Sequence, residues 1–588
     1  MCGIIGCVAD SPVSETLLEG LKRVEYRGYD SAGMATISDG RLNVRKGVGR
    51  VKEIEARQGL AQMRGNIGMA HTRWATHGGV TDLNAHPHAS CKELVAVIHN
   101  GIIENYLPLK RALLARGHRF RSETDTEVIA HIIEDEYLRV KNPLKATIAA
   151  TKKLKGQYAI AVMFQDRPDT IVGARKDAPL IVGVGDKRMF LASDVLAFIG
   201  HTDRTIFLDN FEVVELTKDR VRIVGQDGKE VRRKPTQVAW EISDMSKSDF
   251  EHYTLKEINE QPRTVITASV QDQGRVEAFA KAIRKAKTLY ITASGTSYHA
   301  GLLMKFRLNK EAKIRVDTVV SGELREHAEF LEEGSVVIAF SQSGETADVM
   351  EAVKEAKKRG AKILSIVNAA GSSLARESDE VLLLNCGPEV GVAATKSFTA
   401  QVVVANLVVD SVLGKRRSNG FKELSEAVAE ALKCDEQVRA LVNEFRDRSD
   451  FYFVARGYES PVAMEGALKL KELSYIHAEG MPASELKHGT LALIEKGTPV
   501  LVLNPGGGAH ADTLSNAEEL RARGADVIGV SDQKDEVYKH FIRVPKVQPK
   551  FTPIVEAIPL QLLAYHMSVA RKNDPDYPRN LAKSVTVK

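Results

Sequence analysis

Cys2 directly follows the initiator methionine, in the segment Met1-Cys2-Gly3-Ile4. If an aminopeptidase removes Met1, Cys2 carries a thiol and a free α-amine on one residue. An ordinary thiol has a pKa of roughly 8.5 and an α-amine one of roughly 7.7–8.0, so the amine can serve as the base for the thiol. This pairing is typical of N-terminal nucleophiles. Position alone does not establish it, because a cysteine in second place is more often inert.

A thiolate that attacks a carboxamide needs donors for the oxyanion and groups that hold the substrate. Asn100 and Gly101 follow the apolar run 94–98 and offer an amide and a backbone N–H for an oxyanion hole. Arg73 offers a guanidinium for bidentate binding of a carboxylate, and Asp125 offers a carboxylate for an α-ammonium group. Together these two groups suit the carboxylate and the ammonium group of an amino acid. Because the thiol would cleave a carboxamide, the expected amino acid is glutamine.

Two of these patterns have ordinary structural interpretations. The acidic stretch 122–127 is equally typical of an N-cap and the first turn of a helix. An isolated arginine such as Arg73 is more often structural. His86 and His88 are potential metal ligands, but the spacing of the other candidate ligands is not that of a common zinc site. We therefore expect no metal.

The pattern of predicted strands and helices changes near residue 240. Up to residue 217, short β-type runs such as 94–99 and 158–164 alternate with helical segments such as 124–137. This pattern predicts a layered domain of sheets and helices over residues 2–217. The charged segment 218–278 is predicted to be a connector.

The rest of the chain contains an internal repeat. The offset between the copies is 162 residues at Gly295 and Gly457, and 164 at Gly360 and Gly524. Each copy alternates apolar strands with helical patterns, which predicts a parallel sheet flanked by helices. We expect the copies at 279–419 and 442–578, followed by a tail at 579–588. The matched segments are 289–295 with 451–457, 336–340 with 500–503, and 355–367 with 519–528.

The first copy has two hydroxyl-rich loops, each placed between a strand and a helix. Hydroxyls and backbone N–H groups at such positions favour an anion. One loop alone is as typical of a simple N-cap, but two at corresponding strand ends predict a phosphate site. The loop residues are Thr296 and Ser297 after strand 289–293, and Ser341, Gln342, Ser343 and Thr346 after strand 336–340.

The second copy has lost the hydroxyls of this loop, which reads Asn504-Pro505-Gly506. It carries instead acidic and basic side chains, among them Lys469, Glu472 and His488. Such groups can transfer protons, although a solvated helix face has the same composition. We expect the first copy to bind the phosphate and the second to supply chemistry.

The bulk properties are ordinary for a soluble globular protein. At roughly 150 residues per domain, the 588 residues predict three or four domains. The net charge of +5 argues against nucleic-acid binding. No apolar run approaches the length of a membrane span, and no signal peptide is visible. The five cysteines form no disulfide-like framework, so we expect a cytoplasmic protein without membrane or nucleic-acid partners.

The front of the chain resembles the glutaminase domain of N-terminal-nucleophile amidotransferases. The resemblance rests on segments 2–4, 26–33, 71–78, 99–105 and 122–127, which stand in the family's order. It implies an αββα fold, with Cys2 as the nucleophile and Asn100 and Gly101 as the oxyanion hole. It also implies glutamine contacts from Arg73, Thr76, His77, Gly101 and Asp125, with Arg27 and Trp74 forming and gating the site.

Both repeats resemble sugar isomerase domains, and the whole chain resembles the amidotransferases that aminate and isomerise fructose 6-phosphate. This implies the first step of hexosamine biosynthesis, in which fructose 6-phosphate and glutamine give glucosamine 6-phosphate and glutamate without a cofactor. It further implies a Schiff base on Lys583, proton transfer by Glu472, and Lys469 near the sugar. His488 would assist ring opening from the neighbouring subunit, and a homodimer would follow.

The sequence departs from this family at two places. Ser294 replaces a frequent cysteine, and Ala394 replaces a frequent serine near the sugar. We therefore expect only backbone contacts around Val392. Two alternative functions would require other sequence features. Transfer of ammonia to phosphoribosyl pyrophosphate would need another second domain, and a sugar-phosphate sensor would be expected to lack Cys2, Lys583 or Glu472.

Overall fold

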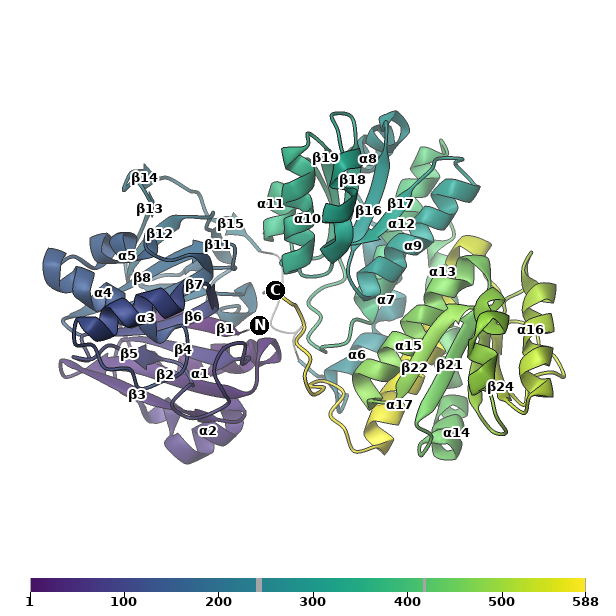
Figure 1. Ribbon diagram of the computed structural model, residues 1–588, viewed down its shortest axis with the longest axis horizontal. Helices are drawn as coiled ribbons and strands as arrows, with labels where there is room; N and C mark the ends of the chain where they lie inside the picture. Colours follow the sequence, from purple (N-terminus) through teal and green to yellow (C-terminus); the bar gives the residue numbers. More distant parts are fainter. Residues whose placement is uncertain (1, 239–245, 416–418, 587–588) are drawn as a thin grey trace. The chain divides into compact units, whose positions relative to one another are not determined.

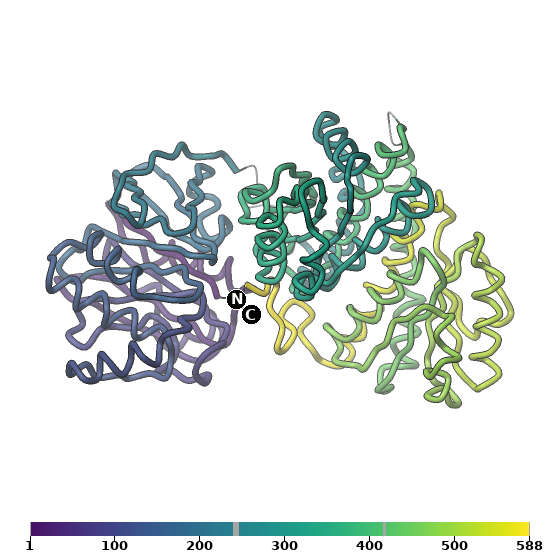
Figure 2. The backbone as a smooth tube through the Cα atoms, turned by 45° about the horizontal axis from the view of Figure 1, so that its top comes forward, coloured from purple at the N-terminus to yellow at the C-terminus, as the bar shows by residue number. Residues whose placement is uncertain are grey.

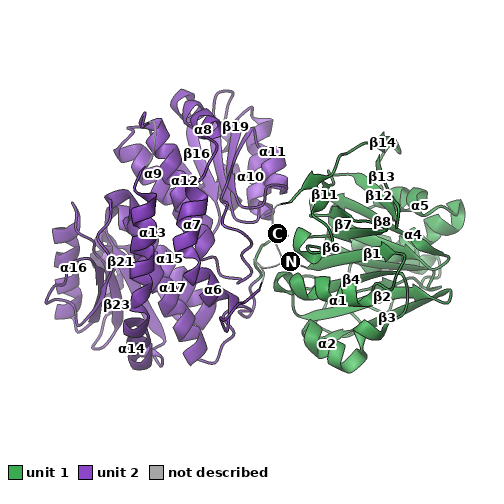
Figure 3. Cartoon of the chain, turned by 180° about the vertical axis from the view of Figure 1, so that it is seen from behind, with its two compact units in different colours: residues 1–245, 582–588 green, residues 246–581 purple. Residues whose placement is uncertain are grey.

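The computed structural model describes residues 2–238, 246–415 and 419–586. The chain forms two compact units (Figure 3), one of residues 1–245 with 582–588 and one of residues 246–581. The division falls inside the predicted connector 218–278, of which residues 239–245 lie outside the described residues. Within the described ranges, no helix is long and apolar enough to cross a bilayer.

The first unit is built on two antiparallel sheets. The eight-stranded sheet has the order β15-β11-β9-β10-β1-β4-β2-β3, and the seven-stranded sheet has the order β14-β13-β12-β8-β7-β6-β5. The first comprises β1 (Gly3–Ala9), β2 (Ser31–Ser38), β3 (Arg41–Val48), β4 (Ile67–Arg73), β9 (Ile181–Val184), β10 (Arg188–Ala192), β11 (Arg204–Phe207) and β15 (Thr236–Gln237). The second comprises β5 (His88–Ala89), β6 (Val95–Ile103), β7 (Gly156–Phe164), β8 (Arg167–Lys176), β12 (Glu212–Thr217), β13 (Arg220–Gly225) and β14 (Glu230–Val231).

Helices cover the outer faces of both sheets (Figure 1). Strand β1 shows why: Ile4 and Val8 pack into the core between the sheets, while Ile5 and Cys7 face the helix side. Both faces of the strand are thus buried, since successive side chains alternate. The resulting αββα arrangement confirms the predicted fold. The helices are α1 (Ser14–Arg23) and α2 (Val51–Gln58) on one side, and α3 (Tyr106–Ala115), α4 (Glu127–Val140) and α5 (Pro143–Thr151) on the other.

The second unit contains two parallel five-stranded sheets with the same strand order. The first has the order β17-β16-β18-β19-β20, and the second β22-β21-β23-β24-β25, so the predicted duplication is confirmed. Figure 2 follows the chain through the first sheet in teal and through the second in green to yellow. The strands are β16 (Leu289–Ala293), β17 (Asp317–Val320), β18 (Val336–Ser341), β19 (Lys362–Val367), β20 (Glu380–Leu383), β21 (Asp450–Ala455), β22 (His477–Pro482), β23 (Pro499–Leu503), β24 (Asp526–Ser531) and β25 (His540–Arg543).

One apolar core runs through both copies of the repeat. It joins side chains such as Phe398 of the first copy with Phe453 and Leu560 of the second. The segment predicted as a connector adds strands β13–β15 to the first unit and helices α6–α8 to the second. The helices of this unit are α6 (Tyr253–Asn259), α7 (Gln261–Ser269), α8 (Gln273–Lys285), α9 (Thr296–Lys310), α10 (Ala347–Lys358), α11 (Ser373–Glu377), α12 (Lys396–Val412), α13 (Phe421–Ala431), α14 (Asp435–Phe445), α15 (Ser460–Ser474), α16 (His510–Ala522) and α17 (Thr552–Ala570).

Candidate active sites in the two units

Cys2 stands immediately before β1, in the first unit. The backbone N–H of Trp74 donates to its Sγ over 3.2 Å. Burial raises the pKa of the Cys2 thiol, whereas this hydrogen bond and the charge of Arg73 act in the opposite direction. The thiol is therefore held in place but needs a base to become a thiolate.

Asn100 and Gly101 lie inside β6, which continues to Ile103 rather than ending at residue 98 as the sequence suggested. The Nδ2 of Asn100 donates to the carbonyl oxygen of Cys2 over 2.8 Å. Gly101 has a φ of +129°, and a Cβ at this position would lie 2.1 Å from the carbonyl oxygen of Gln157 on β7. Only glycine fits here, because the paired strand approaches so closely.

His71 fixes the orientation of the Asn100 side chain. Burial lowers the pKa of His71 to about 3, so the imidazole is neutral at physiological pH. Its Nε2 lies 3.0 Å from Oδ1 of Asn100 and 3.1 Å from the carbonyl oxygen of His99. Both neighbours accept hydrogen bonds, so Nε2 carries the proton and the amide nitrogen of Asn100 is turned toward Cys2. His71 belongs to segment 71–78, but the sequence pattern alone indicates no role for it.

Arg27 and Trp74 surround the same cysteine. The Nε of Arg27 donates to the carbonyl oxygen of Cys2 over 3.4 Å, and its Nη1 forms an ion pair of 2.6 Å with Asp194. The Trp74 ring makes an edge contact with Tyr29, with centroids 5.5 Å apart. Asp194 was missed by sequence reasoning, since it follows β10, far along the chain.

The two side chains expected to hold glutamine, Arg73 and Asp125, are both buried. Arg73 is 3% exposed, and its guanidinium donates to the carbonyl oxygens of His77, Gly78 and Gly79. Burial lowers the pKa of Arg73, while the charges of Cys2, Asp30 and Asp125 oppose this shift. Oδ2 of Asp125 accepts from the N–H of Ile103 over 2.7 Å. Thr76 is exposed, and the His77 ring packs on Tyr106.

The two hydroxyl-rich loops of the second unit lie at one sheet edge. Strands β16 and β18 are parallel neighbours, so the loops that follow them meet at the carboxyl end of the sheet. Ser341 Oγ accepts from the N–H of Gly344 over 2.9 Å and lies 3.3 Å from Thr346 Oγ1. The carbonyl oxygen of Gln342 accepts from the backbone N–H of Asn368. The hydroxyl of Ser343 accepts from the backbone N–H of Glu345.

Thr296 connects the first copy of the repeat with the second. Its Oγ1 donates to Glu465 over 3.0 Å and accepts from Lys469 Nζ over 3.0 Å. The neighbouring Ser297 hydroxyl accepts from Gln401 over 2.8 Å. The start of α9 thus meets one face of α15, and the predicted phosphate loop borders the charged helix.

Lys469 is 1% exposed and pairs with two carboxylates on its own helix. Its Nζ lies 2.6 Å from Glu472 Oε2 and 3.5 Å from Glu465 Oε1. Burial acts to lower the pKa of Lys469, but the charges of Glu472 and Glu465 outweigh it, so the pKa is raised. The charged face of α15 is therefore a buried ion-pair cluster rather than a solvated surface.

Three more of the predicted sugar-site residues belong to other segments of the chain. The N–H of Val392 donates to the carbonyl oxygen of Asp576 over 3.4 Å. His488 is exposed at the end of a short helical segment, Ala483–His488. Lys583 belongs to the segment 582–588, which groups with the first unit.

Comparisons with known proteins agree with both halves of the fold. Residues 71–200 match the glutamine amidotransferase domain, and residues 282–411 and 444–571 match the SIS domain. The chain is 45% identical to a glutamine–fructose-6-phosphate aminotransferase (isomerising) of Thermococcus kodakarensis and 44% identical to one of Pyrococcus horikoshii, over 100% of each chain.

A solved structure resembles the second unit. It is the C-terminal domain of a glucosamine-fructose-6-phosphate aminotransferase from Francisella tularensis, with 35% identity and a TM-score of 0.53. The match covers 56% of this chain and 99% of that one. A tagatose-6-phosphate ketose/aldose isomerase from Escherichia coli, at 20% identity and a TM-score of 0.51, shows the same fold over 56% of this chain and 96% of its own.

Proposed function

Because the chain belongs to the glutamine–fructose-6-phosphate aminotransferase (isomerising) family, we propose specific roles for the residues of its two sites. The reaction converts fructose 6-phosphate and glutamine into glucosamine 6-phosphate and glutamate. The observation that best supports the residue assignment is the pair of hydrogen bonds around Cys2. The Trp74 N–H donates to its sulfur, and the Asn100 side-chain amide donates to its carbonyl oxygen.

Cys2 attacks the carboxamide carbon of glutamine. Because burial disfavours its thiolate, the reaction needs a base, and the α-amine of Cys2 supplies it once Met1 is removed. A C–S bond forms, and the carbonyl oxygen becomes an oxyanion that accepts from Asn100 Nδ2 and the Gly101 N–H. The C–N bond then breaks, the proton held by the amine goes to the leaving nitrogen, and ammonia departs. Water hydrolyses the thioester to glutamate.

Arg73 and Asp125 hold the amino-acid end of glutamine in this proposal. Two opposite charges, both nearly buried, suit the α-carboxylate and the α-ammonium group. The Arg73 guanidinium donates to backbone carbonyl oxygens of the turn at residues 77–79. The same guanidinium would therefore bind both this turn and the substrate carboxylate. Thr76 and His77, on this turn, then contact the substrate from the solvent side.

The sugar half of the reaction uses the hydroxyl loops for the phosphate. Ser341, Ser343 and Thr346 offer hydroxyls at the start of α10, where backbone N–H groups also favour an anion. Lys583 condenses with the C2 ketone and releases water, and ammonia then replaces the lysine nitrogen. Glu472 takes a proton from C1 and returns one to C2, which leaves an amine at C2 and an aldehyde at C1. Lys469 positions the Glu472 carboxylate through their 2.6 Å ion pair.

We further propose a homodimer in the cytoplasm. His488 is exposed, so it is available to assist sugar ring opening in a second copy of the chain. The assignment needs no cofactor, since each proton and each leaving group is handled by a side chain or by water.

Replacing the nucleophile tests the glutaminase assignment. Cys2→Ala is expected to lower glutamine-dependent formation of glucosamine 6-phosphate by about 10³-fold or more. Interconversion of fructose 6-phosphate and glucose 6-phosphate by the same protein should persist, because Cys2 takes no part in that reaction. Cys7→Ala, on the same segment but buried in the helix-side core, is the matched control and should retain both activities. Loss of both activities in Cys2→Ala alone would contradict the division of labour.

A further inference from the structure

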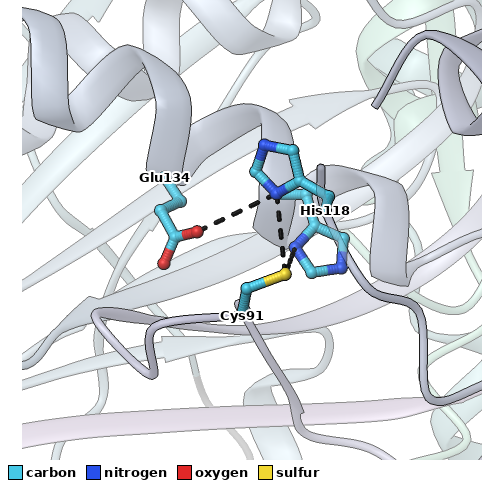
Figure 4. A group of neighbouring side chains, drawn as sticks. Cys91, His118 and Glu134 are labelled. Carbon is cyan, nitrogen blue, oxygen red and sulfur yellow. Dashed lines mark hydrogen bonds and ion pairs between the residues drawn. The ribbon is translucent and has the colours of Figure 1, made fainter. Parts of the chain in front are cut away.

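Four side chains that the proposed reaction does not use gather in the first unit. Cys91, His118, His131 and Glu134 each offer one atom, and these atoms lie within 4.8 Å of one another (Figure 4). His131 and Glu134 are 0% and 1% exposed, so the group is largely closed to solvent.

Three segments of the chain bring these residues together. Cys91 lies in the turn between β5 and β6, and His118 follows α3. His131 and Glu134 stand three residues apart on α4, so they share one face of that helix. Local spacing in the sequence does not reveal this group, because 26 residues separate Cys91 from His118.

The distances suit a tetrahedral zinc ion. Cys91 Sγ lies 3.7 Å from His118 Nδ1 and 3.6 Å from His131 Nδ1. Zinc bonds of about 2.3 Å to sulfur and about 2.0–2.1 Å to nitrogen, at tetrahedral angles, place such ligands about 3.6 Å apart. Glu134 Oε2 lies 4.0 Å from His118 Nδ1, within a small side-chain adjustment of the fourth position.

A carboxylate lies near the far nitrogen of each imidazole. His118 Nε2 lies 2.9 Å from Asp135 Oδ1, and His131 Nε2 lies 3.5 Å from Glu127 Oε1. At His118 the hydrogen bond to the carboxylate keeps the proton on Nε2 and leaves the Nδ1 lone pair for a metal, an arrangement typical of zinc-bound histidines.

The other two ligands are oriented in the same way. Glu134 Oε1 accepts from the Ser90 hydroxyl over 2.5 Å and from the Lys92 N–H over 3.1 Å, so Oε2 remains for the cluster. The backbone N–H of Arg119 donates to Cys91 Sγ over 3.1 Å, which would stabilise a thiolate.

We propose that Cys91, His118, His131 and Glu134 bind one Zn²⁺ ion as a structural site. Four protein ligands fill the tetrahedron and leave no position for a substrate, as in structural rather than catalytic zinc sites. The ion ties the turn after β5 and the segment after α3 to α4. That helix directly follows the loop of Asp125, so zinc stabilises the part of the unit that carries this residue.

Metal binding is measured on the full-length chain in a Cys2→Ala background, which removes the N-terminal thiol as a competing ligand. The protein is stripped with a chelator and titrated with ZnCl₂ by calorimetry and with CoCl₂ by absorption spectroscopy. The proposal predicts one metal per chain, a higher Tm with zinc, and for cobalt the strong visible bands of tetrahedral coordination with a sulfur charge-transfer band. Less than one metal per chain, or cobalt without the sulfur band, would overturn it.

Variants assign the ligands. Cys91→Ser should remove the sulfur band and weaken zinc binding at least about tenfold, whereas Cys434→Ser, a buried cysteine of the other unit, should change neither. Asp135→Asn keeps all four ligands and should weaken zinc binding about 10–100-fold. Equal zinc affinity in Cys91→Ser and Cys434→Ser would refute the site. If Cys91→Ser does not fold, as judged by circular dichroism, the parent cobalt spectrum and Asp135→Asn decide.

Discussion

At the residue scale, the Asn100 amide depends on a neutral histidine. His71 is buried and has a pKa lowered to about 3, so it cannot become a cation that would repel a nearby ammonium group. Its Nε2–H can only face an acceptor, and Oδ1 of Asn100 takes that role. The amide nitrogen is thereby turned toward Cys2 before any substrate binds, and this preorganisation is what an oxyanion hole requires.

Asn100→Ala should therefore impair the turnover of glutamine more than its binding. Removal of one oxyanion donor lowers kcat by about 10²–10³-fold, while KM for glutamine should change little. The measurement is steady-state glutaminase kinetics, with phosphosugar isomerisation by the same sample as an internal standard. Asn43→Ala, on the exposed strand β3, is the control. A variant that loses affinity for glutamine but keeps kcat would assign Asn100 to substrate binding instead.

At the element scale, α17 carries an unusual buried acid. Glu556 is 0% exposed, and neither of its carboxylate oxygens has a hydrogen-bond partner among the described residues. Burial raises the pKa of Glu556 well above its ordinary range, and the charges of Glu459 and Asp532 add to the effect. The native protein therefore keeps a proton on Glu556 at a pH where the unfolded chain has released it.

This difference makes stability depend on pH. The protonated carboxyl of Glu556 contributes its full stability below the pKa that it has in the unfolded chain, about 4.3. This contribution is lost as the pH rises toward the higher pKa that it has in the native protein. Glu556→Gln keeps the shape and cannot ionise, so it should be more stable than the parent at neutral and alkaline pH, with a gap that narrows toward pH of about 4. Urea unfolding across this range measures the gap. Glu426→Gln, at an exposed position of α13, should show none, and a gap independent of pH would contradict the explanation.

Sequence patterns predicted most elements but not their exact ends or their side-chain contacts. The repeat and its parallel sheets follow from the succession of apolar runs and helical patterns, because inner strands such as β16, β18 and β23 are buried on both faces. Strand β6 runs beyond its apolar part since His99 and Asn100 are buried polar residues, which periodicity cannot distinguish from a loop. Helix α4 begins at Glu127, later than predicted, since Ser122 and Glu127 hydrogen-bond across the preceding turn.

The contacts that complete the sites join residues far apart in sequence. Asp194 holds Arg27 across 167 residues, and Lys469 contacts Thr296 across 173. No local pattern encodes such pairs, because they depend on how strands and repeats are stacked. The same limit concealed the Cys91 cluster, in which only His131 and Glu134 share an element.

At the scale of the whole molecule, Cys2 lies in the first compact unit and Glu472 in the second, while Lys583 groups with the first. The family assignment implies that ammonia released at Cys2 reaches the sugar site, and the proposed role of His488 implies that each sugar site uses two chains. In a symmetric dimer, each chain then gives His488 to its partner's site and keeps its own Lys583.

Mixed dimers test this sharing of residues. His488→Ala and Lys583→Ala chains are each expected to be inactive in synthesis. After mixing and subunit exchange, half of the dimers combine the two variants, and each mixed dimer has one intact site, so activity should recover to about a quarter of that of the parent. The control mixes Lys583→Ala with Lys583→Arg, which should recover nothing. Absence of recovery despite verified subunit exchange would place both residues in one chain's site.

The most direct test of the central claim follows the nitrogen atom. The protein is incubated with fructose 6-phosphate, glutamine labelled with nitrogen-15 at its amide, and an excess of unlabelled ammonium, and the product is analysed by mass spectrometry. The account predicts glucosamine 6-phosphate that carries mainly nitrogen-15, with no labelled product from Cys2→Ala. Product that carries mainly unlabelled nitrogen, or labelled product from Cys2→Ala, would contradict it.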